Sequence, residues 1–356
     1  MKQNELDFFL GAISPTGFCG YYHPLLQSMH ERGISLLKGG PGCGKSTLLR
    51  RAKDVFLSQG EVVEALHCAG DPASLDGIVC RAKEFCAIDA TPPHAQEPRY
   101  PIAVENIVSL YRALDAAVLR ENRAEIVTLF EQNRAWNERA ARYITAAGSL
   151  LQDTSRVALC FTDTEKARCF AQSLSRNYIP MGRGSAREDL RLLSAVTSDG
   201  LVFYEQTLAK LADTVIVLDD EFGAAGKVIL EQLCAEALAK GQSVISCYCS
   251  LNPYDKIEHL ILPDLRLCFV THNAYHPITI ARTRTIHCTR FCNQTGIKLR
   301  RKRLRFNQKA ALELLGHATV MLREAKQSHD ALELFYTNAL QLTAVEQIYQ
   351  DWISNL

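Results

Sequence analysis

The sequence lacks both an excess of one charge and a long apolar run. Its 40 Lys and Arg residues nearly balance 39 Asp and Glu residues, so the formal net charge is 40 − 39 = +1. This balance gives no overall field that would attract nucleic acid or an anionic membrane. A membrane-spanning helix needs about 20 consecutive apolar residues, and no stretch approaches that length. We therefore expect no membrane partner; nucleic acid is disfavoured as a partner, though still open.

A signal peptide and a metal-binding cysteine pattern are also missing. In the opening stretch MKQNELDFFLGA, Glu5 and Asp7 stand where a signal peptide would have its apolar core. The 13 cysteines include no C-x-x-C pair and do not repeat in the paired way of zinc ribbons. Scattered cysteines of this kind are typical of small buried side chains in a reducing compartment. We therefore expect a cytoplasmic protein.

What the sequence does contain is a glycine-rich stretch, GGPGCGKST, which matches the phosphate-binding pattern G-x-x-x-x-G-K-[ST]. A loop can wrap a triphosphate only where no Cβ blocks the backbone N–H groups, which is why glycine is required. The apolar run from Ile34 to Lys38 predicts a strand before the loop, and the apolar spacing after it predicts a helix whose N-terminus favours an anion. The predicted nucleotide-binding residues are Gly39, Gly40, Pro41, Gly42, Cys43, Gly44, Lys45, Ser46 and Thr47.

Three of the predicted site residues have specific chemical roles. We expect Lys45 to supply positive charge to the β- and γ-phosphates and the Ser46 hydroxyl to ligate Mg²⁺. Asp89 ends the apolar strand-like run from Phe85, which is the Walker-B arrangement in which the carboxylate holds Mg²⁺ through a water. The expected cofactors are ATP and Mg²⁺, and ATP is favoured because no guanine-specifying N-K-x-D motif is present.

In many P-loop NTPases that hydrolyse nucleotide, a glutamate that activates water follows the Walker-B aspartate. That glutamate is missing here, because Ala90 and Thr91 follow Asp89. Hydrolysis is then slow, or the base lies elsewhere, or the nucleophile is a substrate group. His94 and Asp71 are candidates for a base or a supporting residue, although a structural role is favoured for each. A transition-state arginine could come from Arg81, Arg99 or Arg112, among which the sequence does not choose.

The sequence also repeats itself. FLGAISPTGF, from Phe9, returns as LLSAVTSDGL, from Leu192, and Lys45 returns as Lys227, because 227 − 45 = 182. His94 likewise matches His276 at 276 − 94 = 182. Offsets this constant indicate a tandem duplication of one α/β unit.

The second copy of the loop has decayed. It reads EFGAAGKV, so that Glu221 replaces the first glycine and Val228 replaces the serine that would ligate Mg²⁺. Asp219, Asp220 and Glu221 place carboxylates beside the position of a triphosphate, and each close pair of like charges costs on the order of 1 kcal/mol. We predict a site that keeps the fold without competent catalysis, with a retained phosphate or domain contact for Lys227 as the less favoured alternative.

These patterns predict an α/β protein of two tandem P-loop NTPase-like units, with mainly parallel sheets flanked by helices. Residues 1–180 form the first unit with a helical extension, and residues 181–356 form the degenerate repeat with C-terminal helices. The helical tails are expected from about 104 to 151, 164 to 174 and 308 to 356, as hairpins packed on the sheets or on each other. Gly182 to Ala186 is the predicted linker between the copies.

The densest charge run, KLRRKRLRF, extends from Lys298 to Phe306. The basic residues Lys298–Arg305 would suit an acidic protein partner or a phosphate backbone. The favoured interpretation is a solvated connector, because the chain has no net excess of basic residues and no aromatic residues interleaved for stacking on bases.

Four segments together resemble an uncharacterised bacterial family, found mainly in Firmicutes, of duplicated P-loop ATPase-like proteins. They are FLGAISPTGF, KGGPGCGKSTLL, the HC…DP…LD run (His67 to Asp76) and IDATPPH (Ile88 to His94). The resemblance covers nearly the whole chain and implies a nucleotide-binding protein of the ATPase or kinase-like type, without an established substrate. Both loops are often intact in that family, so the decayed second loop departs from its pattern.

We therefore expect a Mg²⁺-dependent ATP-binding protein that is a slow or partner-stimulated ATPase with one competent site in the first copy. One alternative is a small-molecule or nucleotide kinase. The other is not an enzyme: ATP occupancy would control how the helical tails meet a partner.

Overall fold

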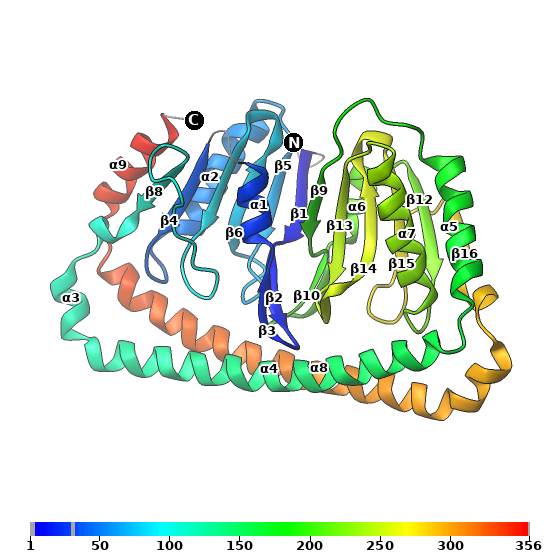
Figure 1. The fold of residues 1–356 in the computed structure, drawn as a ribbon. Coiled ribbons are helices and arrows are strands. Elements are labelled where there is room, and N and C mark those ends of the chain that lie inside the picture. The colour runs from blue at the N-terminus through cyan, green and yellow to red at the C-terminus, as the bar shows by residue number, and fades with distance from the viewer. Residues whose placement is uncertain (1–3, 30–32, 355–356) are drawn as a thin grey trace.

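The computed structural model describes residues 4–29 and 33–354 and contains two six-stranded sheets with the same strand order (Figure 1). The first sheet has the order β1-β5-β6-β7-β4-β8 and comprises β1 (Glu5–Phe9), β4 (Ile34–Lys38), β5 (Val63–His67), β6 (Leu75–Cys80), β7 (Phe85–Asp89) and β8 (Glu105–Ser109). The second has the order β9-β13-β14-β15-β12-β16 and comprises β9 (Glu188–Arg191), β12 (Thr214–Asp219), β13 (Val244–Cys249), β14 (Asn252–Leu262), β15 (Leu267–His272) and β16 (Arg284–His287). We call each sheet with the helices that cover it unit one and unit two.

Each sheet is mixed rather than fully parallel. β6 runs antiparallel to β5 and β7, β14 runs antiparallel to β13 and β15, and the remaining neighbours are parallel. The reversal follows from chain length, because only residues 68–74 connect β5 to β6. A parallel connection needs a crossover of about a dozen residues or more.

Strand register confirms the internal repeat. Leu66 pairs with Gly77 in unit one, and Cys247 pairs with His259 in unit two, so the partners are offset by 247 − 66 = 181 and 259 − 77 = 182. Both strand pairs also have a register irregularity at the same place, just after these residues. The two sheets therefore share their irregularities as well as their topology.

Shorter elements complete the two halves. The hairpins β2 (Gly11–Ser14) with β3 (Gly17–Gly20) and β10 (Ser194–Thr197) with β11 (Gly200–Phe203) are each followed by a short helix, α1 (Tyr22–Ser28) and α6 (Glu205–Leu211). The glycine-rich loop and its degenerate copy each open onto a helix, α2 (Lys45–Ser58) and α7 (Ala225–Ala239). The remaining helices are α3 (Ala116–Glu121), α4 (Arg123–Leu159), α5 (Thr164–Tyr178), α8 (Gln294–Asn338) and α9 (Leu342–Ile353).

Two long helices, α4 and α8, run side by side past the strand ends of both sheets (Figure 1). Their facing residues recur every seven positions, the spacing that keeps one helix seam against another. Buried residues at this spacing are Ala140, Ala147 and Thr154 in α4, and Leu304, Ala311, Ala318, Ala325 and Leu332 in α8. Most of them are small, which lets the two helices approach closely and makes the pair a common base for both units.

The last helix of each half packs on the other unit (Figure 1). The buried residues of α5, such as Leu174, lie in the core of unit two with α7, and Trp352 of α9 lies in the core of unit one beside Phe85. Equivalent backbone hydrogen bonds hold the chain where each half crosses to the other unit. Before α9, Asp115 N–H donates to Ala339 O (2.8 Å) and Gln341 N–H donates to Ala113 O (2.8 Å). Before α5, Asp163 N–H donates to Phe291 O (2.8 Å), and Asn293 N–H donates to Phe161 O (2.7 Å). The spacing is constant, since 291 − 113 = 178 and 339 − 161 = 178. A division at residue 180/181 therefore separates two sequence repeats, whereas each packed unit contains a helix from the other half.

The two sheets meet through equivalent residues. Phe9 and Leu192 exchange both backbone hydrogen bonds, at 2.8 and 2.9 Å, and the sequence repeat aligns these two residues with each other. Beside them, the fully buried Arg191 forms an ion pair with Glu64 of unit one at 2.7 Å. One apolar core, which includes Phe8 and Val215, continues from one half into the other. This continuity ties the two units into one body.

Three sequence expectations need correction or refinement. The helix expected from about residue 104 begins only at Ala116, because residues 105–109 form β8, which pairs with β4. The basic run Lys298–Arg305 is not a connector, since it lies inside α8. The linker Gly182–Ala186 is irregular as expected, yet Gly182 N–H donates to Lys240 O at 2.6 Å, so it is packed. The expected starts and ends at residues 1–3 and 355–356 lie outside the described residues.

Candidate functional site

The glycine-rich stretch connects β4 to α2, as the sequence predicts. Gly42 and Gly44 have φ angles of 64° and 87°, in the left-handed region that glycine adopts at least cost. Lys45 is the first residue of α2, and its ammonium donates to the carbonyls of Gly39 (3.0 Å) and Gly40 (2.9 Å). The lysine is thus folded back over the loop at the positive end of a helix.

Asp89 lies at the carboxyl end of β7, next to β4 in the sheet. Its Oδ2 is 3.5 Å from Lys45 Nζ, while its Oδ1 accepts hydrogen bonds from the N–H (3.0 Å) and hydroxyl (2.6 Å) of Thr91. Ser46 Oγ accepts a hydrogen bond from the N–H of Leu75 at 3.0 Å. The structure therefore brings together the residues for which the sequence predicts chemistry, and Thr91 fixes the orientation of the Asp89 carboxylate.

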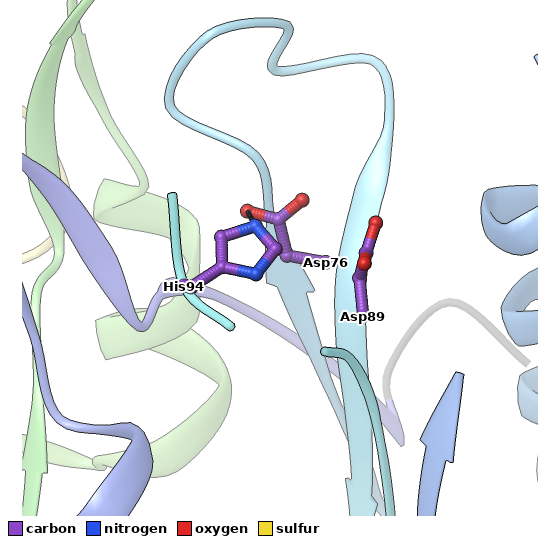
Figure 2. Close-up of side chains that lie close together, drawn as sticks. All are labelled: Asp76, Asp89 and His94. Atoms are coloured by element: carbon purple, nitrogen blue, oxygen red, sulfur yellow. Dashed lines mark ion pairs between the residues drawn. The ribbon is translucent and has the colours of Figure 1, made fainter. Parts of the chain in front are cut away.

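A second acidic side chain and a histidine lie beside Asp89. Asp76 comes from β6, and His94 comes from the loop after β7 (Figure 2). His94 Nε2 is 3.5 Å from Asp76 Oδ2, and its ring stacks on Tyr22 with centroids 5.0 Å apart. Burial alone would lower the pKa of His94, but the Asp76 carboxylate and the nearby Asp89 outweigh it, so that the pKa is raised.

The C-terminal end of α8 covers the glycine-rich loop from outside. A side chain at Gly40 would overlap the ring of Tyr336, and a Cβ at Gly42 would lie 2.8 Å from the carbonyl oxygen of Glu333. Thr337 Oγ1 also lies 3.5 Å from the Gly42 carbonyl. The loop of the first repeat is therefore in contact with a helix of the second repeat, and these glycines permit that close approach.

The other candidates from the sequence do not join this site. Arg81 forms ion pairs with Asp189 and Glu64 between the two sheets, so it is not a transition-state arginine for this loop. Asp71 lies 4.0 Å from Lys326 of α8. Arg99 and Arg112 are exposed, and Arg99 lies over the Tyr100 ring rather than at the loop.

In unit two the equivalent loop is filled by one of its own side chains. The buried Asp220 carboxylate accepts hydrogen bonds from the N–H groups of Gly226 (2.6 Å) and Gly223 (3.1 Å). Burial raises the pKa of Asp220, and these two bonds partly offset that effect. Lys227 Nζ pairs with Asp255 at 2.5 Å and does not fold over the loop. The backbone N–H groups that could bind a phosphate in this loop thus already donate to the Asp220 carboxylate.

Sequence reasoning missed Thr91, Asp76 and the α8 contact as parts of the site. For Asp76 a signal was present, because Asp76 and His94 return as Glu258 and His276 at the same offset: 258 − 76 = 182 and 276 − 94 = 182. The carboxylate–histidine contact returns too, with His276 Nδ1 3.5 Å from Glu258 Oε1. No sequence signal locates the end of α8, because that contact depends on the crossing of the long helices.

A scan against protein-family models and searches of curated proteins and of solved structures each found no match. Among the described residues, no helix combines the length and the apolar character that crossing a membrane requires. The functional interpretation therefore depends on the geometry of the two units.

Proposed function

We propose that unit one binds Mg²⁺·ATP at residues 39–47 and cleaves it slowly, with stimulation by a partner or substrate. One observation carries the proposal: Lys45 Nζ, at the start of α2, lies 3.5 Å from Asp89 Oδ2, at the end of β7, beside a loop with left-handed glycines. A cation, a carboxylate and a helix N-terminus in this arrangement suit a metal-bound polyphosphate.

Each residue then has a defined role. Lys45 exchanges its bonds to the Gly39 and Gly40 carbonyls for bonds to phosphate oxygens, which are stronger because both partners are charged. Ser46 Oγ has a further lone pair beyond the one that accepts from Leu75, and it would ligate Mg²⁺. Asp89, oriented by Thr91, would hold the same ion through water. Bound Mg²⁺ would neutralise charge on the phosphates.

Slow turnover follows from what surrounds Asp89. Ala90 is buried and apolar, and Thr91 uses its hydroxyl on Asp89, so neither residue can activate water. His94 is the nearest imidazole, and Asp76 orients it. A phosphoryl acceptor other than water would also suit this environment, which keeps a small-molecule or nucleotide kinase as an alternative reaction.

A regulatory module is the second candidate, and the α8 contact favours it. Tyr336 and Thr337 lie against Gly40 and Gly42, so a nucleotide that reshapes the loop would also move the end of α8. ATP occupancy would then control the long helices and whatever they contact, such as an acidic protein at Lys298–Arg305.

The decisive experiment compares the two units through matched lysines. We expect Lys45→Ala to weaken Mg²⁺·ATP binding by about 10- to 100-fold, since a charge-assisted hydrogen bond contributes about 1.5–3 kcal/mol. Lys227→Ala, at the equivalent position, should leave binding unchanged. Calorimetric titration of both variants measures this, and loss of binding in Lys227→Ala alone would refute the proposal.

Turnover separates the remaining alternatives. ADP formation measured with and without a panel of metabolites tests the ATPase and the kinase, and a phosphorylated panel member identifies the kinase. Tight ATP binding with negligible turnover, together with a partner affinity that changes with ATP, identifies the regulatory module.

A further inference from the structure

Unit one contains a compact cluster of two carboxylates and one imidazole, of which the proposed nucleotide chemistry requires only Asp89. One ligand atom from each of Asp76, Asp89 and His94 lies within 4.8 Å of the others, and the three come from β6, β7 and the following loop (Figure 2). Two ligands on opposite sides of a transition metal are about 4.2 Å apart, twice a bond of about 2.1 Å. Adjacent ligands on one ion are closer than this, about 3 Å apart, so the three side chains must rotate toward one another to bind it.

The histidine in this cluster is held in place but incompletely bonded. Its side chain is only 6% exposed and stacks on Tyr22, yet Nδ1 has no hydrogen-bond partner among the described residues. An unpaired buried nitrogen costs about 1–3 kcal/mol, so a structural histidine would normally have a partner. The Tyr22 hydroxyl is also buried and lies beside Asp76.

Unit two shows what the same pair does when a cation is built in. Its equivalent carboxylate, Glu258, forms an ion pair with Lys256 at 2.7 Å and lies 3.5 Å from His276. Lys256 holds the pKa of Glu258 well below its ordinary value, although burial acts in the opposite direction. The residue at the position of Lys256 in unit one is Ser74, because 256 − 74 = 182. Among the described residues, only His94 lies within ion-pair distance of Asp76.

We propose that Asp76, Asp89 and His94 bind a divalent transition-metal ion, of the Mn²⁺ or Zn²⁺ class, at the position that a lysine ammonium serves in unit two. One imidazole nitrogen with two carboxylates suits these ions better than Mg²⁺ or Ca²⁺, which prefer oxygen ligands alone. The site is separate from the Mg²⁺ that would accompany ATP, although Asp89 is common to both. Two of its three ligands, Asp76 and His94, lie outside residues 39–47, so we expect the ion to bind without nucleotide.

The test uses the full chain without nucleotide and Mn²⁺ alone as the probe, with free Mn²⁺ measured by electron paramagnetic resonance. We expect one bound Mn²⁺ per chain. His94→Ala and Asp76→Asn should each weaken it by at least about 10-fold, since each removes a ligand. His276→Ala is the matched control in unit two and should bind as the unaltered protein does.

Two further variants separate this site from the nucleotide site and from misfolding. Lys45→Ala should keep or strengthen Mn²⁺ binding, because it removes an ammonium beside Asp89, even though the same variant loses ATP. Ser74→Lys removes no ligand but supplies the cation found in unit two, so it should abolish Mn²⁺ binding while thermal unfolding shows a folded protein. The proposal is overturned if the unaltered chain binds no Mn²⁺ at millimolar concentration, or if His94→Ala binds Mn²⁺ as tightly as the unaltered protein.

Discussion

Units one and two share strand order, register irregularities and a loop that leads into a helix. They differ in the charged side chains that lie at that loop. In unit one a lysine folds over glycine carbonyls, and two carboxylates at the neighbouring strands lack a full complement of cations. In unit two Asp220 occupies the loop and Lys256 neutralises Glu258. Side chains of unit two thus perform what a bound anion and a bound cation would perform in unit one.

If unit one binds the proposed ligands, this difference explains how unit two keeps the same shape without them. Backbone N–H groups at a helix start need an acceptor, and a buried carboxylate needs a cation, whether a ligand or the chain itself supplies them. Substitutions at Asp220 and Lys256 supply both from within. Unit two can then support the long helices without a bound ligand.

The largest expected effect comes from removing the contact by which α9 packs on unit one. Trp352→Ala removes a buried indole that packs near Phe85 and donates from Nε1 to Ser35 Oγ at 2.9 Å. We expect the free energy of unfolding to fall by about 3–5 kcal/mol, as for other buried aromatic truncations. Urea unfolding measures this loss. ATP affinity should fall too, because α9 continues from the helix that covers the loop.

The matched variant in unit two is Leu174→Ala, since 352 − 178 = 174. Leu174 is 1% exposed in the core beneath α7, so a cost of about 2–5 kcal/mol is expected. ATP affinity should stay unchanged in this variant. A Trp352→Ala protein of unaltered stability would show that the crossing does not hold unit one together.

Much of the fold could be predicted from sequence because its signals are local. The repeat, the β4–loop–α2 unit and the position of Asp89 depend on patterns within a few dozen residues. β8 was missed because Leu110, Leu114 and Ala117 imitate helical spacing, whereas the strand at 105–109 is fixed by pairing with β4. The packing of α5 and α9 on the opposite units leaves no local trace, and the sequence left open whether the helical tails pack on the sheets or on each other.

An effect of intermediate size is expected from removing the carboxylate that occupies the loop of unit two. Asp220→Ala leaves the N–H groups of Gly223 and Gly226 without their acceptor, at a cost of about 1–3 kcal/mol. The melting temperature should fall and then recover in part when sulfate is added, because the freed N–H groups form an anion site. Differential scanning calorimetry with increasing sulfate measures both effects.

The control for that experiment is Asp219→Ala. Asp219 is the adjacent carboxylate, is 40% exposed and forms an ion pair with the exposed His287. It should cost no more than about 0.5 kcal/mol and show no added response to sulfate. Equal stabilisation of Asp220→Ala and the unaltered protein by sulfate would contradict the idea of a self-filled loop.

The candidate site was only partly predictable, for a similar reason. Lys45, Ser46 and Asp89 belong to motifs whose chemistry fixes their spacing, so the sequence places them. Asp76 and Thr91 act through neighbours that only the folded sheet supplies. The sequence also suggests three carboxylates repelling phosphate in unit two, whereas the structure gives Asp220 a specific bonded role and leaves Asp219 outside.

The smallest expected effect concerns a contact that exists beneath unit two alone. Asp153 of α4 accepts from Arg303 Nε (2.9 Å) and Asn307 Nδ2 (2.8 Å) of α8, and its counterpart in α8 is Ala331, since 153 + 178 = 331. Hydrogen bonds from Arg303 lower the pKa of Asp153 to about 2. Because the folded pKa lies below the ordinary value of 3.8, the stabilisation is present above pH 3.8 and disappears as the pH falls through about 2.

Asp153→Asn should therefore reduce the free energy of unfolding at pH 7 by about 0.5–1 kcal/mol, as expected for a largely solvent-screened ion pair. The difference between the variant and the unaltered protein should shrink steadily in urea unfolding between pH 4 and the lowest pH at which the chain stays folded. Asp330→Asn, whose partner Lys326 lies on the same helix, is the control and should change stability by less than about 0.5 kcal/mol. A constant difference for Asp153→Asn across that range would mean that shape, rather than charge, makes this contact, and that the two ends of the helix pair differ less than their sequences indicate.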